Sequence, residues 1–263
     1  ELDRQKERFI NGALKNGITK DVANFVFTKI EPFAQYGFNK SHAAAYALIA
    51  YQTAYLKTYH KEDFIAATMS TELTNTSKLR EFVEELKKLN IEIVKPSINK
   101  CFSDFKAING KLFYGLGAIK NVGFEAISNI VNERENNGEF KSFNDFINRV
   151  NAKDVNKLQL EGLVKAGVFD EFDKDRSKIL NSIPKIIQKI KNINDDKENQ
   201  QSNLFDEQEK NKEEFDFESS ETWSVKELLS EEFKSIGFYL TNHPLNEFEE
   251  IFNQLKIKSY NQF

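Results

Sequence analysis

The spacing of apolar residues predicts a series of helices over the first third of the chain. Apolar positions recur with the period of an α-helix in residues 2–17, 18–38, 41–59, 61–73 and 78–90. In the last segment the apolar stripe consists of Leu79, Phe82, Val83, Leu86 and Leu89. Gly17 predicts the end of the first helix, and Pro32 with Gly37 predicts the end of the second. This run of helices indicates a helical first domain over residues 1–95.

The pattern changes after Asn90. Residues 91–99 are expected to be extended, because Pro96 cannot continue a helix. The pair Asn109-Gly110 lies between two apolar runs and predicts a β-hairpin. Helical patterns return in 124–138, 142–150 and 156–167, which places a second region over residues 96–190. The sequence therefore predicts a mainly α fold with a small β-hairpin.

The section 191–222 is rich in charged and amide side chains, and its composition predicts a disordered, flexible linker. An amphipathic pattern returns in 223–263, where we expect the terminal helices. Within the linker, the segment 201–205 places Leu204 beside Phe205 in a run of charge. Such a pair can insert into an apolar groove of a partner protein while Gln201 hydrogen-bonds its rim. A chance apolar pair is the alternative.

Charge and composition narrow the function classes. The net charge of −4 predicts no overall attraction to nucleic acid, so any contact with a polyanion must be local. The one cysteine, Cys101, excludes an intrachain disulfide and fits a reducing compartment. The three histidines have no metal-binding spacing. We see no signal peptide and no apolar run long enough for a bilayer, and we expect a cytoplasmic piece of a longer polypeptide.

The stretch from Tyr36 to Lys57 offers a candidate anion site at a helix start. If Ser41 is the N-cap, the free amides of the first turn face outward between Lys40 and His42, which suits a phosphate. A buried helix that Ser41 only caps explains the same residues, and physical chemistry alone favours it. The helix body is expected to be core, because small and apolar residues permit close packing: Ala43, Ala44, Ala47, Leu48, Ala50 and Ala54.

A second candidate is the segment 115–131, which predicts a helix, a tight turn and a helix. Its turn consists of Lys120, Asn121, Val122 and Gly123, the arrangement of a helix-hairpin-helix, whose turn amides bind DNA phosphates without reading sequence. Asn121 stands where glycine is usual, and asparagine tolerates a left-handed backbone. Lys120 is the expected accessory phosphate contact. A plain corner between two helices remains the alternative.

Farther along, the segment 156–172 repeats part of this pattern, with Lys165 and Gly167 in its turn. The structural interpretation needs no DNA. It makes Leu158, Leu163 and Val164 a core stripe and Gly167 a helix stop.

The sequence of residues 36–70, which contains "FNKSH" followed by "AYQTAYLK", closely resembles the fingers domain of the bacterial replicative DNA polymerase III alpha subunit. The resemblance continues nearly to the end of the chain. It implies that 1–95 is the C-terminal part of the fingers and 96–190 a helix-hairpin-helix region. The linker 191–222 would then carry a clamp-binding peptide, and 223–263 would lead to an oligonucleotide-binding-fold domain.

The resemblance also implies roles for particular residues. The incoming nucleotide would contact Phe38, Asn39, Lys40, Ser41 and His42. Of these, Phe38 and His42 would discriminate against a 2′-hydroxyl. Duplex DNA would contact Lys120, Asn121, Val122 and Gly123, and the sliding clamp would contact Gln201, Leu204 and Phe205.

For the whole protein the resemblance implies a DNA-directed DNA polymerase that extends a primer on a template with deoxynucleoside triphosphates. Its partners would be primer-template DNA, the sliding clamp and other replicase subunits. The catalytic Mg²⁺ ions would be held by palm carboxylates upstream of this chain. The Asp-x-Asp pattern of Asp173 and Asp175 is rejected as that site, and the chain is expected to contain no catalytic residue. A non-catalytic helix-hairpin-helix DNA-binding adaptor is the rival function, and a purely structural helical scaffold is a third.

Overall fold

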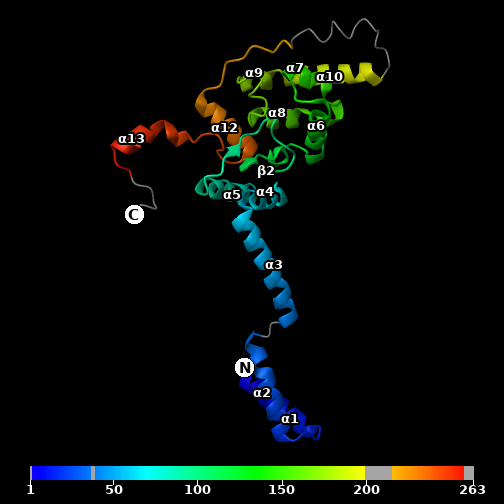
Figure 1. Ribbon diagram of the computed structural model, residues 1–263, viewed down its shortest axis with the longest axis vertical. Coiled ribbons are helices and arrows are strands. Elements are labelled where there is room, and N and C mark those ends of the chain that lie inside the picture. The colour runs from blue at the N-terminus through cyan, green and yellow to red at the C-terminus, as the bar shows by residue number, and fades with distance from the viewer. Residues whose placement is uncertain (1, 37–38, 199–214, 258–263) are drawn as a thin grey trace. The chain divides into compact units, whose positions relative to one another are not determined.

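The computed structural model describes residues 2–36, 39–198 and 215–257 (Figure 1). The chain forms two compact units, Glu1–Tyr59 and His60–Phe263. Helices α4 (Lys61–Thr71) and α5 (Thr76–Lys88) belong to the second unit because their apolar side chains join its core.

The first unit contains α1 (Leu2–Lys15), α2 (Lys20–Tyr36) and α3 (Lys40–Tyr59). The first two helices pack through Phe9 and Phe27, whose ring centroids lie 5.6 Å apart. The core position predicted for the body of α3 is wrong, because none of its residues is buried. Its apolar side chains are spread around the helix instead of forming one stripe, and nothing in the described part of the chain covers them.

In the second unit, helices pack around a small β-sheet. Its elements after α5 are β1 (Ile93–Val94), β2 (Lys106–Ile108), β3 (Lys111–Phe113), η1 (Leu116–Ala118), α6 (Phe124–Asn137), α7 (Phe143–Arg149), η2 (Ala152–Asp154), α8 (Lys157–Lys165), α9 (Arg176–Asn181), α10 (Ile183–Glu198), α12 (Val225–Ile236), η3 (Pro244–Phe248) and α13 (Glu249–Gln254). The predicted mainly α class is confirmed. No helix in the described ranges is long and apolar enough to span a membrane.

The predicted β-hairpin is present. β2 and β3 are antiparallel, and β1 joins β3 in parallel, which gives the strand order β1-β3-β2. Asn109 and Gly110 turn the hairpin with φ values of 52° and 75°, the positive φ that a two-residue hairpin turn requires. Ser70 on α4 hydrogen-bonds the backbone of Phe105, which ties that helix to the sheet.

The core of the second unit contains a group of phenylalanines in tilted and edge-to-face contact. Phe143, Phe146 and Phe169 lie 4.9–5.8 Å apart by ring centroids, and all three are buried. On the α4–α5 side, Met69 and Leu86 are fully buried in the same core. This shared core is the physical reason that α4 and α5 separate from the helices before them.

Both ends of the section 191–222, where a linker is expected, lie within the described residues. Helix α10 (Ile183–Glu198) continues into this section, and its own residues Ile186 and Ile190 are fully buried. Residues 215–222, which we call the strap, pack against the rest of the second unit. The Ser177 hydroxyl donates to the Glu221 carbonyl at 2.9 Å, and the Thr222 hydroxyl donates to Asp175 at 2.8 Å.

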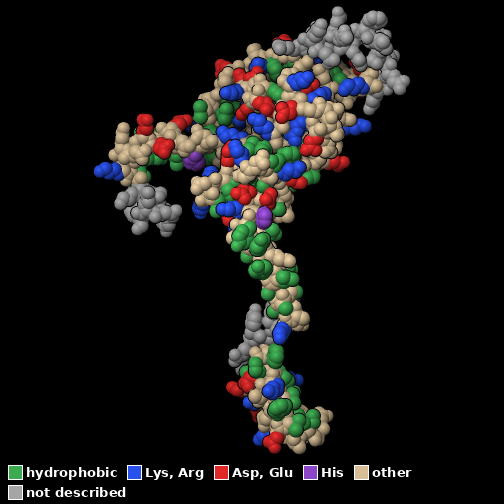
Figure 2. All heavy atoms as spheres, viewed as in Figure 1, with side chains coloured by type: hydrophobic (Ala, Val, Ile, Leu, Met, Phe, Trp, Pro, Cys, Tyr) green, Lys and Arg blue, Asp and Glu red, His purple; other side chains and the backbone are tan. Residues whose placement is uncertain are grey.

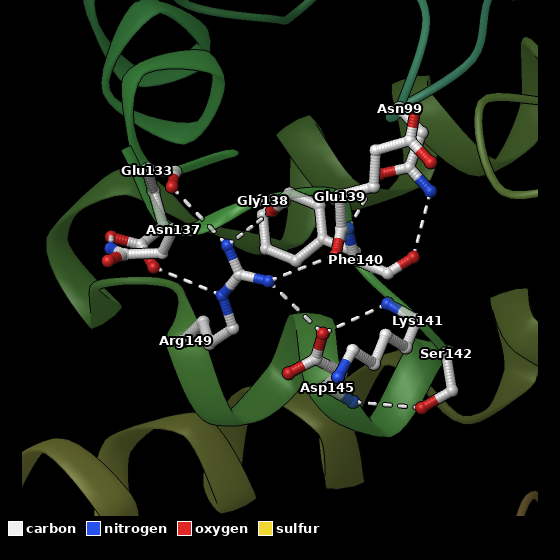
Figure 3. A network of polar contacts seen from close by, with 10 residues as sticks. All are labelled: Asn99, Glu133, Asn137, Gly138, Glu139, Phe140, Lys141, Ser142, Asp145 and Arg149. Atoms are coloured by element: carbon white, nitrogen blue, oxygen red, sulfur yellow. Dashed lines mark hydrogen bonds and ion pairs between the residues drawn. The ribbon is translucent and has the colours of Figure 1, made fainter. Parts of the chain in front are cut away.

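An arginine network closes the far end of α6 (Figure 3). The Arg149 guanidinium, at the end of α7, donates to the Glu133 and Asp145 carboxylates at 3.1 Å each. It also donates to the carbonyl oxygens of Gly138 at 2.8 Å and of Glu133 and Glu139 at 3.3 Å. The carbonyl groups that the end of a helix leaves free are thereby satisfied, and α6 is held against α7.

Candidate nucleic-acid interface

The segment 115–131 forms a tight turn that leads into α6, but it has only one short turn of helix before the turn. That first helix was expected to be regular, whereas the structure has the 3₁₀ turn η1 (Leu116–Ala118). A Cβ atom at Gly115 would lie 2.8 Å from the backbone nitrogen of Phe105. The chain therefore passes directly against the 104–105 backbone here, and this close approach holds the segment extended up to η1.

The turn itself has the backbone predicted from its sequence. Asn121 has a φ of 66°, the left-handed conformation that asparagine tolerates. Gly123 is the N-cap of α6 in an extended conformation, and no side chain caps the helix. The glycine is thus used for its small size, because a Cβ atom there would lie 3.1 Å from the Gln159 amide nitrogen.

The start of α6 presents free donors. Within the described residues, no acceptor pairs with the amides of Gly123, Phe124, Glu125 or Ala126. Gly123, Phe124 and Glu125 are exposed and Ala126 is half-buried, so these amides lie at the surface. Such amides carry the positive end of the helix dipole and suit a phosphate oxygen. The helix start therefore offers the donors that a phosphate group requires.

Two residues that sequence reasoning missed hold the turn from behind. Gly162, inside α8, is packed so closely that a Cβ atom there would lie 2.6 Å from the Lys120 carbonyl oxygen. The Lys120 amide donates to the Ser235 carbonyl on α12 at 2.9 Å. The one sequence signal for the first contact is a glycine within an otherwise good helix, which often marks a close packing contact.

The charge around the turn is mixed. Lys120 is exposed and its side chain extends toward Gly237, where an added Cβ would lie 3.2 Å from its Nζ atom. Glu125 lies in the first turn of α6. Figure 2 shows basic and acidic side chains interspersed on the visible face of the second unit. This pattern agrees with the net charge of −4, and a polyanion would be held locally.

The repeated pattern in 156–172 is a structural feature. The Gly167 turn is filled by the buried Arg176, which donates to Asp170 at 2.6 and 2.7 Å and to the Lys165 carbonyl at 2.9 Å. Leu163 and Val164 are buried as expected. Leu158 was placed in the core stripe, and that is wrong. It is 58% exposed, because it lies on the solvent side of the first turn of α8.

The start of α3 differs from the sequence prediction in its cap. Asn39, not Ser41, takes the N-cap position, because its side-chain oxygen accepts hydrogen bonds from the Ser41 amide at 3.0 Å and the Ser41 hydroxyl at 2.7 Å. Lys40, Ser41 and His42 are exposed. The His42 ring packs against Tyr46 with centroids 4.2 Å apart. The helix start is therefore open to solvent. Phe38 lies outside the described residues.

Gln201, Leu204 and Phe205, the predicted contacts with the sliding clamp, lie outside the described residues. Asp173 pairs with Lys178 at 2.6 Å, and Asp175 caps α9, so the Asp-x-Asp pattern has a structural use. Among the described residues, no three or more acidic, histidine or cysteine side chains are placed to hold a metal ion.

Comparison with known proteins finds a family match over the region that contains the turn. Residues 90–179 match a family model described as a helix-hairpin-helix motif. The chain is 39% identical over 253 residues to the DNA polymerase III subunit alpha of Borreliella burgdorferi, an alignment that covers 95% of this chain and 22% of that protein.

Other bacterial relatives agree. The corresponding protein of Caulobacter vibrioides is 39% identical over 94% of this chain and 22% of its own length. That of Campylobacter jejuni is 39% identical over 97% of this chain and 22% of its own length. The chain thus spans about a fifth of the length of these relatives. The resemblance inferred from the sequence is confirmed: nearly the whole chain is related to one segment of the bacterial DNA polymerase III alpha subunit.

Proposed function

We propose that this chain works within a DNA-directed DNA polymerase that extends a primer on a template, and that its own task is to hold the duplex by the phosphate backbone. The observation that carries the proposal is the exposed start of α6, where the amides of residues 123–126 have no acceptor in the described part of the chain. Lys120 adds a charge beside them. Contacts of this kind position DNA without reading its sequence.

The open start of α3 supports a second task. Lys40, Ser41 and His42 lie at an exposed helix N-terminus, where an incoming deoxynucleoside triphosphate could place its phosphates. Asn39 satisfies the Ser41 amide, so the exposed side chains of Lys40, Ser41 and His42 would contact the ligand. With Phe38, these residues are the proposed nucleotide contacts. The catalytic Mg²⁺ ions would be bound by carboxylates outside this chain.

A third proposed task is attachment to the sliding clamp through Gln201, Leu204 and Phe205. The described residues on either side of this segment belong to the second unit, since α10 runs to Glu198 and Phe217 packs against Phe143. A ring that binds the segment would therefore be attached to that unit. Other replicase subunits are further proposed partners.

A non-catalytic DNA-binding adaptor is the rival function, because the turn alone would suffice for it. The two functions differ in one respect. A polymerase requires palm carboxylates in the same reading frame, and an adaptor does not.

Fluorescence anisotropy with a labelled blunt DNA duplex tests the duplex contact. Affinity should fall steeply with salt, and Lys120→Ala should weaken binding to all sequences alike and reduce the salt slope by about one. Lys174→Ala is the matched control, an exposed lysine outside the turn. Duplex affinity that does not change with salt concentration, or equal losses of affinity in the two variants, would refute the proposal.

A further inference from the structure

A groove on the second unit, about 420 Å³ in volume, contains a row of aromatic rings. Its walls come from α5, α12 and the segment 238–246. The rings of Phe233 and Tyr239 have centroids 5.0 Å apart, and those of Tyr239 and His243 are 5.1 Å apart. We call Phe233, Tyr239 and His243 the aromatic row. Phe233 and His243 are exposed and Tyr239 is half-buried, so the row is open to solvent.

The aromatic row is held rigidly. Glu232 is fully buried, and its carboxylate accepts hydrogen bonds from the Leu240 amide at 3.0 Å and the Thr241 amide at 2.9 Å. The Thr241 hydroxyl donates to the same carboxylate at 2.7 Å. Gly237, in a left-handed conformation, ends α12 and starts this segment. The backbone on both sides of Tyr239 is thus held in place before any ligand arrives.

The polar groups of the row are available to a ligand. The His243 Nδ1 atom accepts from the Leu245 amide at 3.2 Å, which leaves Nε2 with the ring proton and, in the described ranges, without a partner. The Tyr239 hydroxyl also has no partner among the described residues. Aromatic faces beside unused donors are the chemistry that binds unpaired nucleobases, whose rings stack and whose edges hydrogen-bond.

The rim of the groove supplies a cation for the backbone. Arg80 is exposed and makes no ion pair within the described part of the chain. Lys87 is paired with Glu84 at 2.9 Å, so those two charges offset each other. The groove therefore carries the unbalanced charge of Arg80, which complements a phosphate. A duplex would hide its base faces, whereas a single strand offers both bases and phosphates.

The groove adjoins the proposed duplex contact. The Lys120 amide donates to Ser235, on the helix that carries Phe233. The Lys120 Nζ atom lies beside Gly237, two residues before Tyr239. We propose that the aromatic row binds the unpaired strand of DNA that continues from a duplex held at the turn. This inference rests on the proposed duplex contact and adds a second, single-strand site to it.

The test compares a labelled blunt duplex with the same duplex bearing a short single-stranded overhang. The unaltered chain should bind the overhang-bearing duplex more tightly. Tyr239→Ala and Phe233→Ala should each remove this advantage, a loss of about tenfold, and leave blunt-duplex binding unchanged. Arg80→Gln should lower the salt slope of the overhang contribution by about 0.7.

Two controls separate stacking from folding. Phe248→Ala removes a ring of matching exposure, 44% against 43% for Phe233, outside the groove, and should keep the advantage. Tyr239→Phe keeps the ring and loses only the hydroxyl, so it should keep most of the advantage that Tyr239→Ala removes. Equal affinity of the unaltered chain for the two probes would overturn this inference alone, while absence of blunt-duplex binding would overturn the proposed duplex contact. Equal losses in Tyr239→Ala and Phe248→Ala would also overturn it.

Discussion

Gly162 is the residue whose substitution tests most directly whether packing behind the turn sets DNA affinity. In Gly162→Ala, the new Cβ atom would lie 2.6 Å from the Lys120 carbonyl oxygen and 3.4 Å from the Val122 side chain. The first distance is shorter than real Cβ contacts. Because the obstacle is backbone, relief requires that α8 and the turn move apart.

Two opposing effects determine the size of the change. Alanine in place of glycine favours a helix interior by about 1 kcal/mol. Overpacking costs about 1–3 kcal/mol, and a backbone obstacle places this site in the upper part of that range. The net expectation is a loss of about 1–2 kcal/mol in the free energy of unfolding. Gly12, inside α1, has nothing within 4 Å of its Cβ position, so Gly12→Ala retains only the favourable effect.

Urea denaturation and duplex binding report the two consequences. Gly162→Ala should unfold at lower urea than the unaltered chain. The folded variant should bind blunt duplex about tenfold more weakly, because hydrogen bonds to a charged phosphate contribute about 1.5–3 kcal/mol each and depend on the position of the turn. Gly12→Ala should keep full affinity. A Gly162→Ala protein with unchanged stability and affinity would refute the role assigned to this contact.

Three further predictions concern other parts of the chain. Arg149→Lys should lower the free energy of unfolding by about 2–3 kcal/mol, because one ammonium group cannot make all the contacts of the guanidinium. The control Arg80→Lys, at an exposed arginine, should change that free energy by less than about 0.5 kcal/mol. Equal urea midpoints for the two variants would contradict the role of the arginine network. The pKa of Asp175 lies below its ordinary value of 3.8, chiefly because the serine hydroxyl two residues on donates to it. The stabilisation that the Asp175 carboxylate provides is therefore complete well above that value and is lost as pH falls through the folded pKa. The difference in urea midpoint between the unaltered chain and Asp175→Asn should shrink below about pH 4. A difference that stays constant with pH would contradict this prediction. Leu204→Ala combined with Phe205→Ala should abolish capture on immobilised sliding clamp, and undiminished capture would remove that segment from the proposed function.

The sequence by itself determined the features that depend on a few neighbouring residues. Asn109-Gly110 turns the β-hairpin, and Asn121 adopts the left-handed backbone, because their φ preferences act locally. The stripe with Leu79, Val83 and Leu86 predicted a helix with one buried face, and those residues are buried. The turn that leads into α6 was found the same way.

Tertiary structure decided what lies behind and around these elements. The contacts of the turn with Gly162 and Ser235 join segments far apart in the chain, and no local period encodes them. The exposure of α3 and the placement of α4 with the second core also depended on which faces find a partner. A helix pattern specifies an apolar face, but only the assembled chain determines what covers it. For the same reason the aromatic row appeared only in the folded structure, where Glu232 fixes the segment that carries Tyr239.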